Sequence, residues 1–131
     1  MSESGGQQPV VTSTAAAGTF ISGDSGNLAA AAGTATLAGV AGKTTVMDGL
    51  VVTGLGATAA STVDVTVTGA ANTINFALTI PAGAGLQVTP LALTFPVPIA
   101  AAAPNTALVL NVPSFGAGNT NARGTCHGRQ L

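Results

Sequence analysis

Two neighbouring segments of the sequence alternate between apolar side chains and polar or small ones. Val63, Val65 and Val67 alternate with polar residues, and residues 74–80 repeat the pattern with Ile, Phe, Leu and Ile. A period of two places alternate side chains on opposite faces of an extended chain, so it predicts β-strands. The connection over residues 69–72 is Gly-Ala-Ala-Asn, which suits a tight turn. The sequence therefore predicts an antiparallel hairpin at its centre.

Further short segments with strand character follow one another along the chain. We predict strands over residues 44–53, 86–95, 106–112 and 122–129, with Gly- or Pro-rich connections at 54–56, 81–83, 96–104 and 115–119. Pro90 falls inside one of these strands, which places that strand at a sheet edge or at a bulge. The Ala-rich runs are interrupted by Gly, Thr and Pro, so we expect almost no helix. This spacing predicts an all-β fold, an antiparallel β-sandwich or jelly roll.

The first third of the sequence departs from this pattern. Residues 13–42 are mainly Ala, Gly, Ser and Thr, whose side chains bury little apolar surface. We therefore predict an extended N-terminal arm over residues 1–42 and a jelly-roll-like β-sandwich domain over residues 43–131. The arm would gain order by lying on a neighbouring subunit, with a plain flexible tail as the alternative. The apolar residues that would anchor it at this partner interface are Val10, Val11, Phe20, Ile21, Leu28 and Leu37.

The chain is unusually poor in charge. Charged residues make up 5% of it, where about 25% is typical of soluble domains. With three basic residues and a net charge of −1, it lacks the basic surface that binds a phosphate backbone, so we expect no nucleic-acid partner. No apolar run reaches the ~20 residues that span a bilayer, and no secretory signal is recognisable. We expect a chain made in the cytoplasm, without a membrane partner, whose bland surface is covered in a stable oligomer or larger assembly.

Sequences that resemble catalytic or phosphate-binding motifs lack the groups that the chemistry requires. Residues 23–26, Gly-Asp-Ser-Gly, resemble the surroundings of a nucleophilic serine, but His127 lies near the other end of the chain. Residues 42–44, Gly-Lys-Thr, resemble the end of a phosphate-binding loop, but the glycine required five positions before Gly42 is missing. Lys43 is better interpreted as a surface or interface charge, with a partner such as Asp48 or a residue of a neighbouring chain. We expect neither an enzyme nor a cofactor.

The remaining polar residues do not form a recognisable site. Cys126 and His127 supply two metal ligands, but a metal site needs three or four, and neighbours on a strand point to opposite faces. We interpret them as a buried thiol beside a hydrogen-bonded imidazole. Asp24, Asp48 and Asp64 are too scattered to suggest a carboxylate pair. The absence of Trp and Tyr removes the usual stacking platforms for sugars.

From about Gly42 to its C-terminus the chain resembles a type of small virion protein of tailed phages that is encoded near the capsid genes. The likeness covers about two-thirds of the chain and resides in turns and strand edges. The residues that carry it are Ala41–Thr44, Gly54–Ser61, Ile80–Gly83, Pro104–Ala107, Val112–Asn121 and His127–Gly128.

This resemblance implies a role in the virion. Phage decoration (cement) proteins are often jelly rolls that sit as dimers or trimers where capsomers meet. The resemblance thus implies a structural protein on the capsid surface, with the major capsid protein and further copies of itself, as a homodimer or homotrimer, as its partners. Two alternatives stay open. One is a tail, neck or head-fibre subunit, and the other is a receptor- or glycan-binding β-sandwich module.

Overall fold

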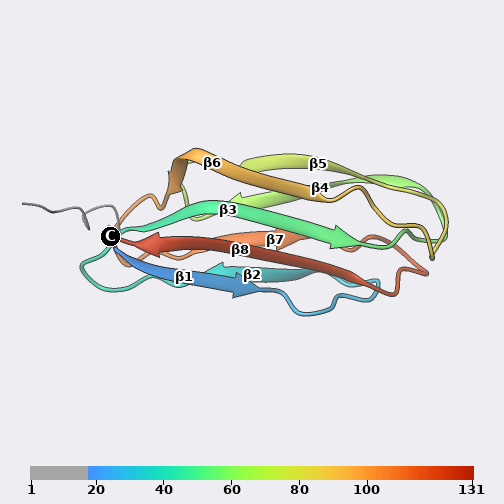
Figure 1. Cartoon of the computed structure of the whole chain (residues 1–131), viewed down its shortest axis with the longest axis horizontal. Helices are drawn as coiled ribbons and strands as arrows, with labels where there is room; N and C mark the ends of the chain where they lie inside the picture. The colour runs from blue at the N-terminus through green and yellow to red at the C-terminus, as the bar shows by residue number, and fades with distance from the viewer. Residues whose placement is uncertain (1–17) are drawn as a thin grey trace, which may run out of the picture.

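The computed structural model describes residues 18–131, which form eight β-strands and no helix (Figure 1). The strands are β1 (Thr19–Asp24), β2 (Gly33–Leu37), β3 (Thr45–Gly54), β4 (Ser61–Thr68), β5 (Ile74–Ile80), β6 (Leu91–Ala100), β7 (Leu108–Val112) and β8 (Ala122–Gln130). The described part of the chain therefore holds no helix long and apolar enough to cross a membrane.

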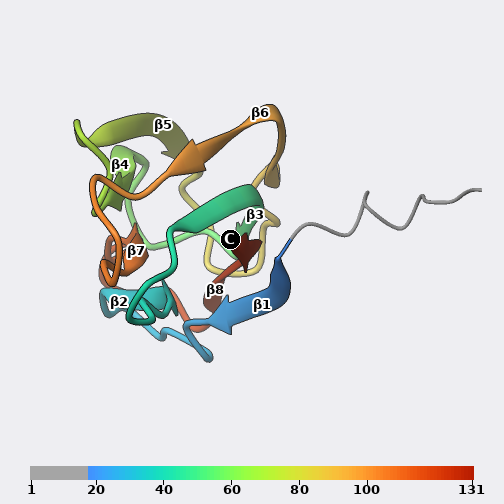
Figure 2. The same cartoon turned by 90° about the vertical axis from the view of Figure 1, so that its left-hand side faces the viewer.

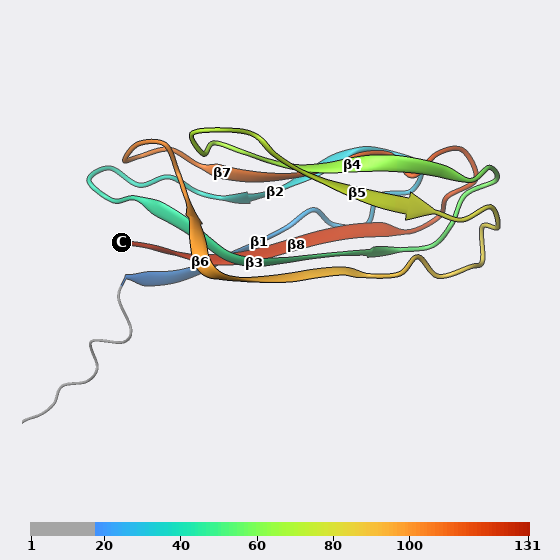
Figure 3. The ribbon, with the colours of Figure 1, turned by 90° about the horizontal axis from the view of Figure 1, so that it is seen from above.

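The strands form two antiparallel sheets of four strands each. The strand order is β1-β8-β3-β6 in the first sheet, called sheet A below, and β2-β7-β4-β5 in the second, sheet B. The end-on view in Figure 2 shows the sheets face to face, and the view from above in Figure 3 shows them as two elongated layers. Apolar side chains of both sheets form one buried cluster between them, as in a β-sandwich.

The pairing of the strands is nested. β4 pairs with β5, β3 with β6, β2 with β7 and β1 with β8, all antiparallel. The chain is thus a long hairpin with its tip at the β4–β5 turn, and it is rolled up so that β8 also pairs with β3 and β7 with β4. Strands distant in sequence are consequently neighbours, and the two sheets are completed only when both ends of the chain are in place.

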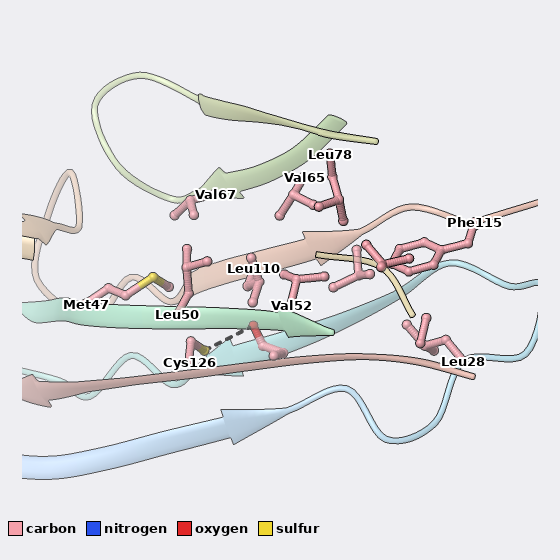
Figure 4. Close-up of a cluster of buried hydrophobic side chains, with 14 of the residues drawn as sticks. Leu28, Met47, Leu50, Val52, Val65, Val67, Leu78, Leu110, Phe115 and Cys126 are labelled. Atoms are coloured by element: carbon pink, nitrogen blue, oxygen red, sulfur yellow. Dashed lines mark hydrogen bonds between the residues drawn. The ribbon is translucent and has the colours of Figure 1, made fainter. Parts of the chain in front are cut away.

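The core lies between the sheets and is filled by aliphatic side chains and one aromatic ring. Figure 4 shows Leu50 and Val52 of β3 directed toward Val65 of β4 and Leu110 of β7, with Phe115 closing the core toward one end. All five of these side chains are at most 1% exposed. Each strand contributes alternate residues, as the period-two pattern requires.

Strand β8 has small residues where it faces the core. Its inward positions include Ala122, Gly124, Cys126 and Gly128. A Cβ atom on Gly124 would lie 2.5 Å from Cγ2 of Val112 on β7, so the larger side chains of the opposite sheet occupy this space. β8, one of the two central strands of sheet A, is therefore close-packed because of small residues that contribute little apolar area themselves.

The predicted central hairpin is confirmed, since β4 and β5 pair over Ser61–Thr68 and Ile74–Ile80. Gly69, at φ +99°, makes the turn possible, because a Cβ atom there would collide with the carbonyl oxygen of Ala107. The strands predicted over residues 44–53, 106–112 and 122–129 are also present, with slightly different ends.

The boundary between the strand predicted over residues 86–95 and the loop predicted over residues 96–104 was wrong. β6 runs from Leu91 to Ala100 and includes Pro96 and Pro98, while Pro90 precedes it. β6 is an edge strand, and its pairing with β3 shifts between Met47 and Gly49, opposite the two prolines. Proline is tolerated at such a position because it does not have to donate to a ladder.

The prediction of an extended arm over residues 1–42 is corrected for residues 18–42. β1 pairs with β8 and β2 pairs with β7, so both strands belong to the sheets. The segment between them is fixed as well, because the amide of Leu28 donates to the carbonyl of Ala122 at 2.7 Å and the amide of Ala30 to Oδ1 of Asn119 at 3.1 Å. Low side-chain hydrophobicity was misleading, since short edge strands gain stability from ladder hydrogen bonds and a few buried residues. Residues 1–17 lie outside the described part.

Candidate functional site

The outer face of sheet A carries most of the charged side chains. Four of the six charged residues among residues 18–131 lie there, namely Asp24, Asp48, Arg123 and Arg129. They form two ion pairs, Arg123–Asp24 at 3.4 Å and Arg129–Asp48 at 2.9 Å. Because each positive charge is matched by a negative one on the same face, sheet A presents no net charge to a partner.

The ion pair between Arg129 and Asp48 is bidentate and half-buried. Nε and Nη2 of Arg129 donate to the two carboxylate oxygens of Asp48 at 2.9 and 3.0 Å, and this hydrogen bonding raises the pKa of Arg129. Asp48 sits where the pairing register of β3 shifts. The irregularity brings its side chain to the arginine. The earlier suggestion that Asp48 pairs with Lys43 was wrong.

Cys126 and His127 point to opposite sides of β8, as predicted. The Cys126 side chain is 2% exposed and its thiol donates to the carbonyl oxygen of Ala35 at 3.8 Å (Figure 4), whereas His127 is exposed on the outer face of sheet A. The two side chains therefore do not share a site. Within the described residues, no three His, Cys, Asp or Glu side chains are grouped so that they could hold a metal ion.

The Gly-Asp-Ser-Gly sequence of residues 23–26 forms the end of β1 and a turn. The carboxylate of Asp24 accepts a hydrogen bond from the amide of Gly26 at 3.0 Å. The hydroxyl of Ser25 donates to the carbonyl of Gly26 at 2.8 Å and accepts from the amide of Gly124 at 2.9 Å. His127 is paired with Ser22 in the β1–β8 ladder. The serine hydroxyl thus has a role in fixing the turn.

The outer face of sheet B has a different character, because it is polar but nearly uncharged. Alternation along the four strands directs to this face Thr34, Thr36, Thr62, Asp64, Thr66, Thr68, Asn75, Ala77, Thr79, Val109 and Asn111. Asn111 lies near its centre and donates to Oγ1 of Thr68 at 3.2 Å and to the carbonyl of Thr66 at 3.4 Å. Asp64 is the one formal charge on these strands' outward positions.

This surface was missed in the sequence analysis, although a signal for it exists. Thr-x-Thr occurs at residues 34–36 and 66–68, and threonine recurs at alternate positions in β4. Threonine fits a pleated surface and exposes a hydroxyl and a methyl group together. Threonines that recur at alternate positions of a strand could therefore have been interpreted as an exposed hydrogen-bonding face.

The six predicted anchor residues occupy different places in the molecule. Leu28 and Leu37 are core side chains, 9% and 0% exposed, so the prediction that they contact a partner is corrected. Ile21 is half-buried against the core, whereas Phe20 is 69% exposed on the outer face of sheet A. The remaining two, at positions 10 and 11 (Val10 and Val11), lie outside the described residues.

The surface of residues 18–131 includes two open concavities. One, of about 460 Å³, lies between β5 and the chain that leads into β6, and its walls include Ala77, Thr79, Gln87 and Pro90. The other, of about 320 Å³, is lined by residues at the β2 and β7 edge of sheet B, including Asp64.

Comparison with known proteins found no family model, no curated protein and no solved structure that matches this chain.

Proposed function

We propose that this chain is a structural virion protein, a jelly roll that decorates a phage capsid and stabilises it by binding between major capsid protein subunits. The observation that carries the proposal is the hydrogen-bonding face of sheet B, which has a single charged residue, Asp64. The fold of the chain and the resemblance of its sequence to small phage virion proteins add to this argument.

The strand order supports the jelly roll. A rolled-up hairpin produces two sheets of four strands with the orders β1-β8-β3-β6 and β2-β7-β4-β5. In this arrangement the first strand pairs with the last, and each pair of strands nests inside the next. Jelly rolls with eight strands recur in viral capsid proteins and in lectins. The fold is thus compatible with a capsid role and does not by itself select it.

The outer face of sheet B supports a role as an interface. Burying a charge without a partner is unfavourable by several kcal/mol, whereas threonine and asparagine can exchange water for hydrogen bonds to a partner at small net cost. A face with eleven outward positions and one charge therefore needs little electrostatic matching from the protein it covers. This suits a subunit that is bound at many equivalent places on a shell.

The proposal predicts that a positive charge at the centre of sheet B weakens binding to capsids. Thr66 is outward-facing and paired with Asn75 and Asn111, so Thr66→Lys leaves the core intact. We expect at least about a tenfold loss of affinity for capsids, equivalent to ~1.4 kcal/mol, measured by co-sedimentation of the tagged protein with particles that lack it. Thr94→Lys, on the exposed outer face of sheet A, is the matched control and should bind like the wild type.

The copy number in the particle distinguishes the proposed role from the main alternative. A decoration protein follows the symmetry of the shell and is present in hundreds of copies, whereas a tail, neck or head-fibre subunit is present in tens or fewer. Quantitative mass spectrometry of particles produced by the genome that encodes the chain measures this number. Absence from the particles would refute a virion role altogether.

A further inference from the structure

The four edge strands of the two sheets differ in how they are protected against pairing with another chain. β1 and β2 protect each other, because a Cβ atom on Gly23 would lie 2.5 Å from the carbonyl oxygen of Thr36, so one side of the molecule is nearly closed. β6 contains Pro96 and Pro98. β5, Ile74–Ile80, has no proline and no charged residue along its length. Exposed strands of this kind are templates for strand pairing unless something covers them.

The side of the molecule where β5 lies is also open and apolar. In Figure 2, β5 and β6 lie at the side opposite β1 and β2. Several half-buried apolar residues pack against the core from these two strands, namely Ile74, Phe76, Leu91, Leu93, Phe95 and Ile99. The concavity of about 460 Å³ follows the second half of β5 from Ala77 to Pro81. Within residues 18–131, this edge therefore combines a strand that pairs with a neighbour on one side only and incompletely buried apolar side chains.

The sequence of β5 is complementary to itself when it runs antiparallel. About Ala77 as the centre, Phe76 matches Leu78, Asn75 matches Thr79 and Ile74 matches Ile80. The apolar pairs would all lie on the core side of the sheet and the polar pair on the outer side. A two-fold axis produces such an isologous contact, in which the same patch is used twice. A second copy of β5 therefore fits this edge with like side chains opposite each other.

We propose that the β5 edge pairs with β5 of a second copy of this chain about a two-fold axis through Ala77, which joins two copies of sheet B into one eight-stranded sheet. Main-chain hydrogen bonds would provide the affinity, and the matched side chains would fix the register. The joined outer faces would form one continuous threonine- and asparagine-rich surface. This inference rests on the strand edge alone and does not depend on the proposed role in a virion.

The test uses a charge at the axis. Ala77 is exposed, faces outward and is paired with Asp64 of its own chain, so Ala77→Lys gains an intramolecular partner and should fold. In the dimer the two lysines would lie directly opposite each other, which is unfavourable. We expect the full-length wild type to sediment as a dimer at micromolar concentration, and Ala77→Lys to raise the dimer dissociation constant at least about tenfold. A mixture of Ala77→Lys and Ala77→Glu should dimerise again.

The matched control is Thr36→Lys, an exposed outward position on β2, the other edge strand of sheet B. It should remain as dimeric as the wild type. A cysteine at position 77 provides a second measurement that needs no charge. Directly opposed residues have Cβ atoms ~4.5–5.5 Å apart, so Ala77→Cys should form a disulfide-linked dimer on mild oxidation, while the native Cys126 is buried.

Three results would overturn the proposal. The first is a wild type that is monomeric or trimeric, and the second is dissociation by Thr36→Lys in place of Ala77→Lys. The third is an Ala77→Cys protein that does not cross-link while the wild type is a dimer. Circular dichroism shows whether each variant is folded. If Ala77→Lys is not folded, cross-linking of Ala77→Cys still tests whether the two β5 edges pair.

Discussion

The thiol of Cys126 is held in the core in its protonated form. Its side chain is 2% exposed and contacts the carbonyl oxygen of Ala35. Burial raises its pKa from 9.0 to about 11, a change that the hydrogen bond with the Gly23 backbone partly opposes. Because the thiolate is the reactive form, this environment makes Cys126 unreactive, and its role is to pack in the core.

The raised pKa of Cys126 predicts how stability depends on pH. Below the unfolded-state pKa the thiol is protonated in both states, and the folded state has its full stability. As the pH rises from about 9 to about 11, the unfolded chain loses the proton first, so the free energy of unfolding falls. Urea midpoints at pH 7, 9 and 11 measure this. Cys126→Ala should flatten the decline, and an equal decline in that variant would contradict the assignment.

Gly124 and Val112 are an example of size matching across the core. Cγ2 of Val112 lies close to the place where a Cβ atom on Gly124 would be. We therefore expect Gly124→Ala to destabilise the fold by about 1–3 kcal/mol through overpacking. Val112→Ala alone should also destabilise, because it leaves a cavity.

The double variant of these two positions should be more stable than the sum of the single effects predicts, because the new methyl group enters the space that the valine leaves. Thermal unfolding of all four proteins in a double-mutant cycle measures the coupling free energy. Additive effects within about 0.5 kcal/mol would show that the two positions do not share this space.

At the scale of elements, β1 and β2 are edge strands that the composition of the N-terminal third concealed. They contain few large apolar residues, yet each completes a sheet, and the segment supplies Leu28, Ala35 and Leu37 to the core. Leu37 is fully buried, and its Cδ1 lies close to Gly128 of β8. Removal of this segment would therefore expose the inner surfaces of β7 and β8.

Two truncations test whether the N-terminal segment is a separate arm or an integral part of the fold. Deleting residues 1–40 removes β1 and β2 and should abolish cooperative unfolding, because three core residues and two ladders are lost. Deleting residues 1–17 keeps every described strand and should leave the melting temperature within a few degrees of the wild type. A stable protein after the longer deletion would restore the idea of a separate arm.

At the scale of the whole molecule, the two outer faces divide the surface into unlike halves. The face of sheet A pairs its own charges, whereas the face of sheet B has one charge and many hydroxyl groups. The open β5 edge belongs to the second face. Self-association at this edge would thus enlarge the surface that we propose as the capsid-binding one and leave the charged face in solvent.

The sequence by itself determined the β class, the central hairpin and the side to which individual residues point. Val65 is buried and Thr66 is on the outer face because alternation is a local property of an extended chain. Cys126 and His127 were assigned to opposite faces by the same reasoning. Signals that act between residues one or two positions apart can be interpreted without knowing what the chain packs against.

Only the tertiary structure decided which strands pair outside the central hairpin and where the domain begins. β1 pairs with β8 and β2 with β7, and nothing local to either partner specifies this, because backbone ladders are the same for every sequence. Likewise the requirement for a small residue at Gly124 arises only from Val112 and Leu110 in the opposite sheet. Pro96 is compatible with β6 because this strand lies at the sheet edge and its pairing with β3 is irregular there. These features depend on groups brought together from both ends of the chain, so the pattern along one segment could not reveal them.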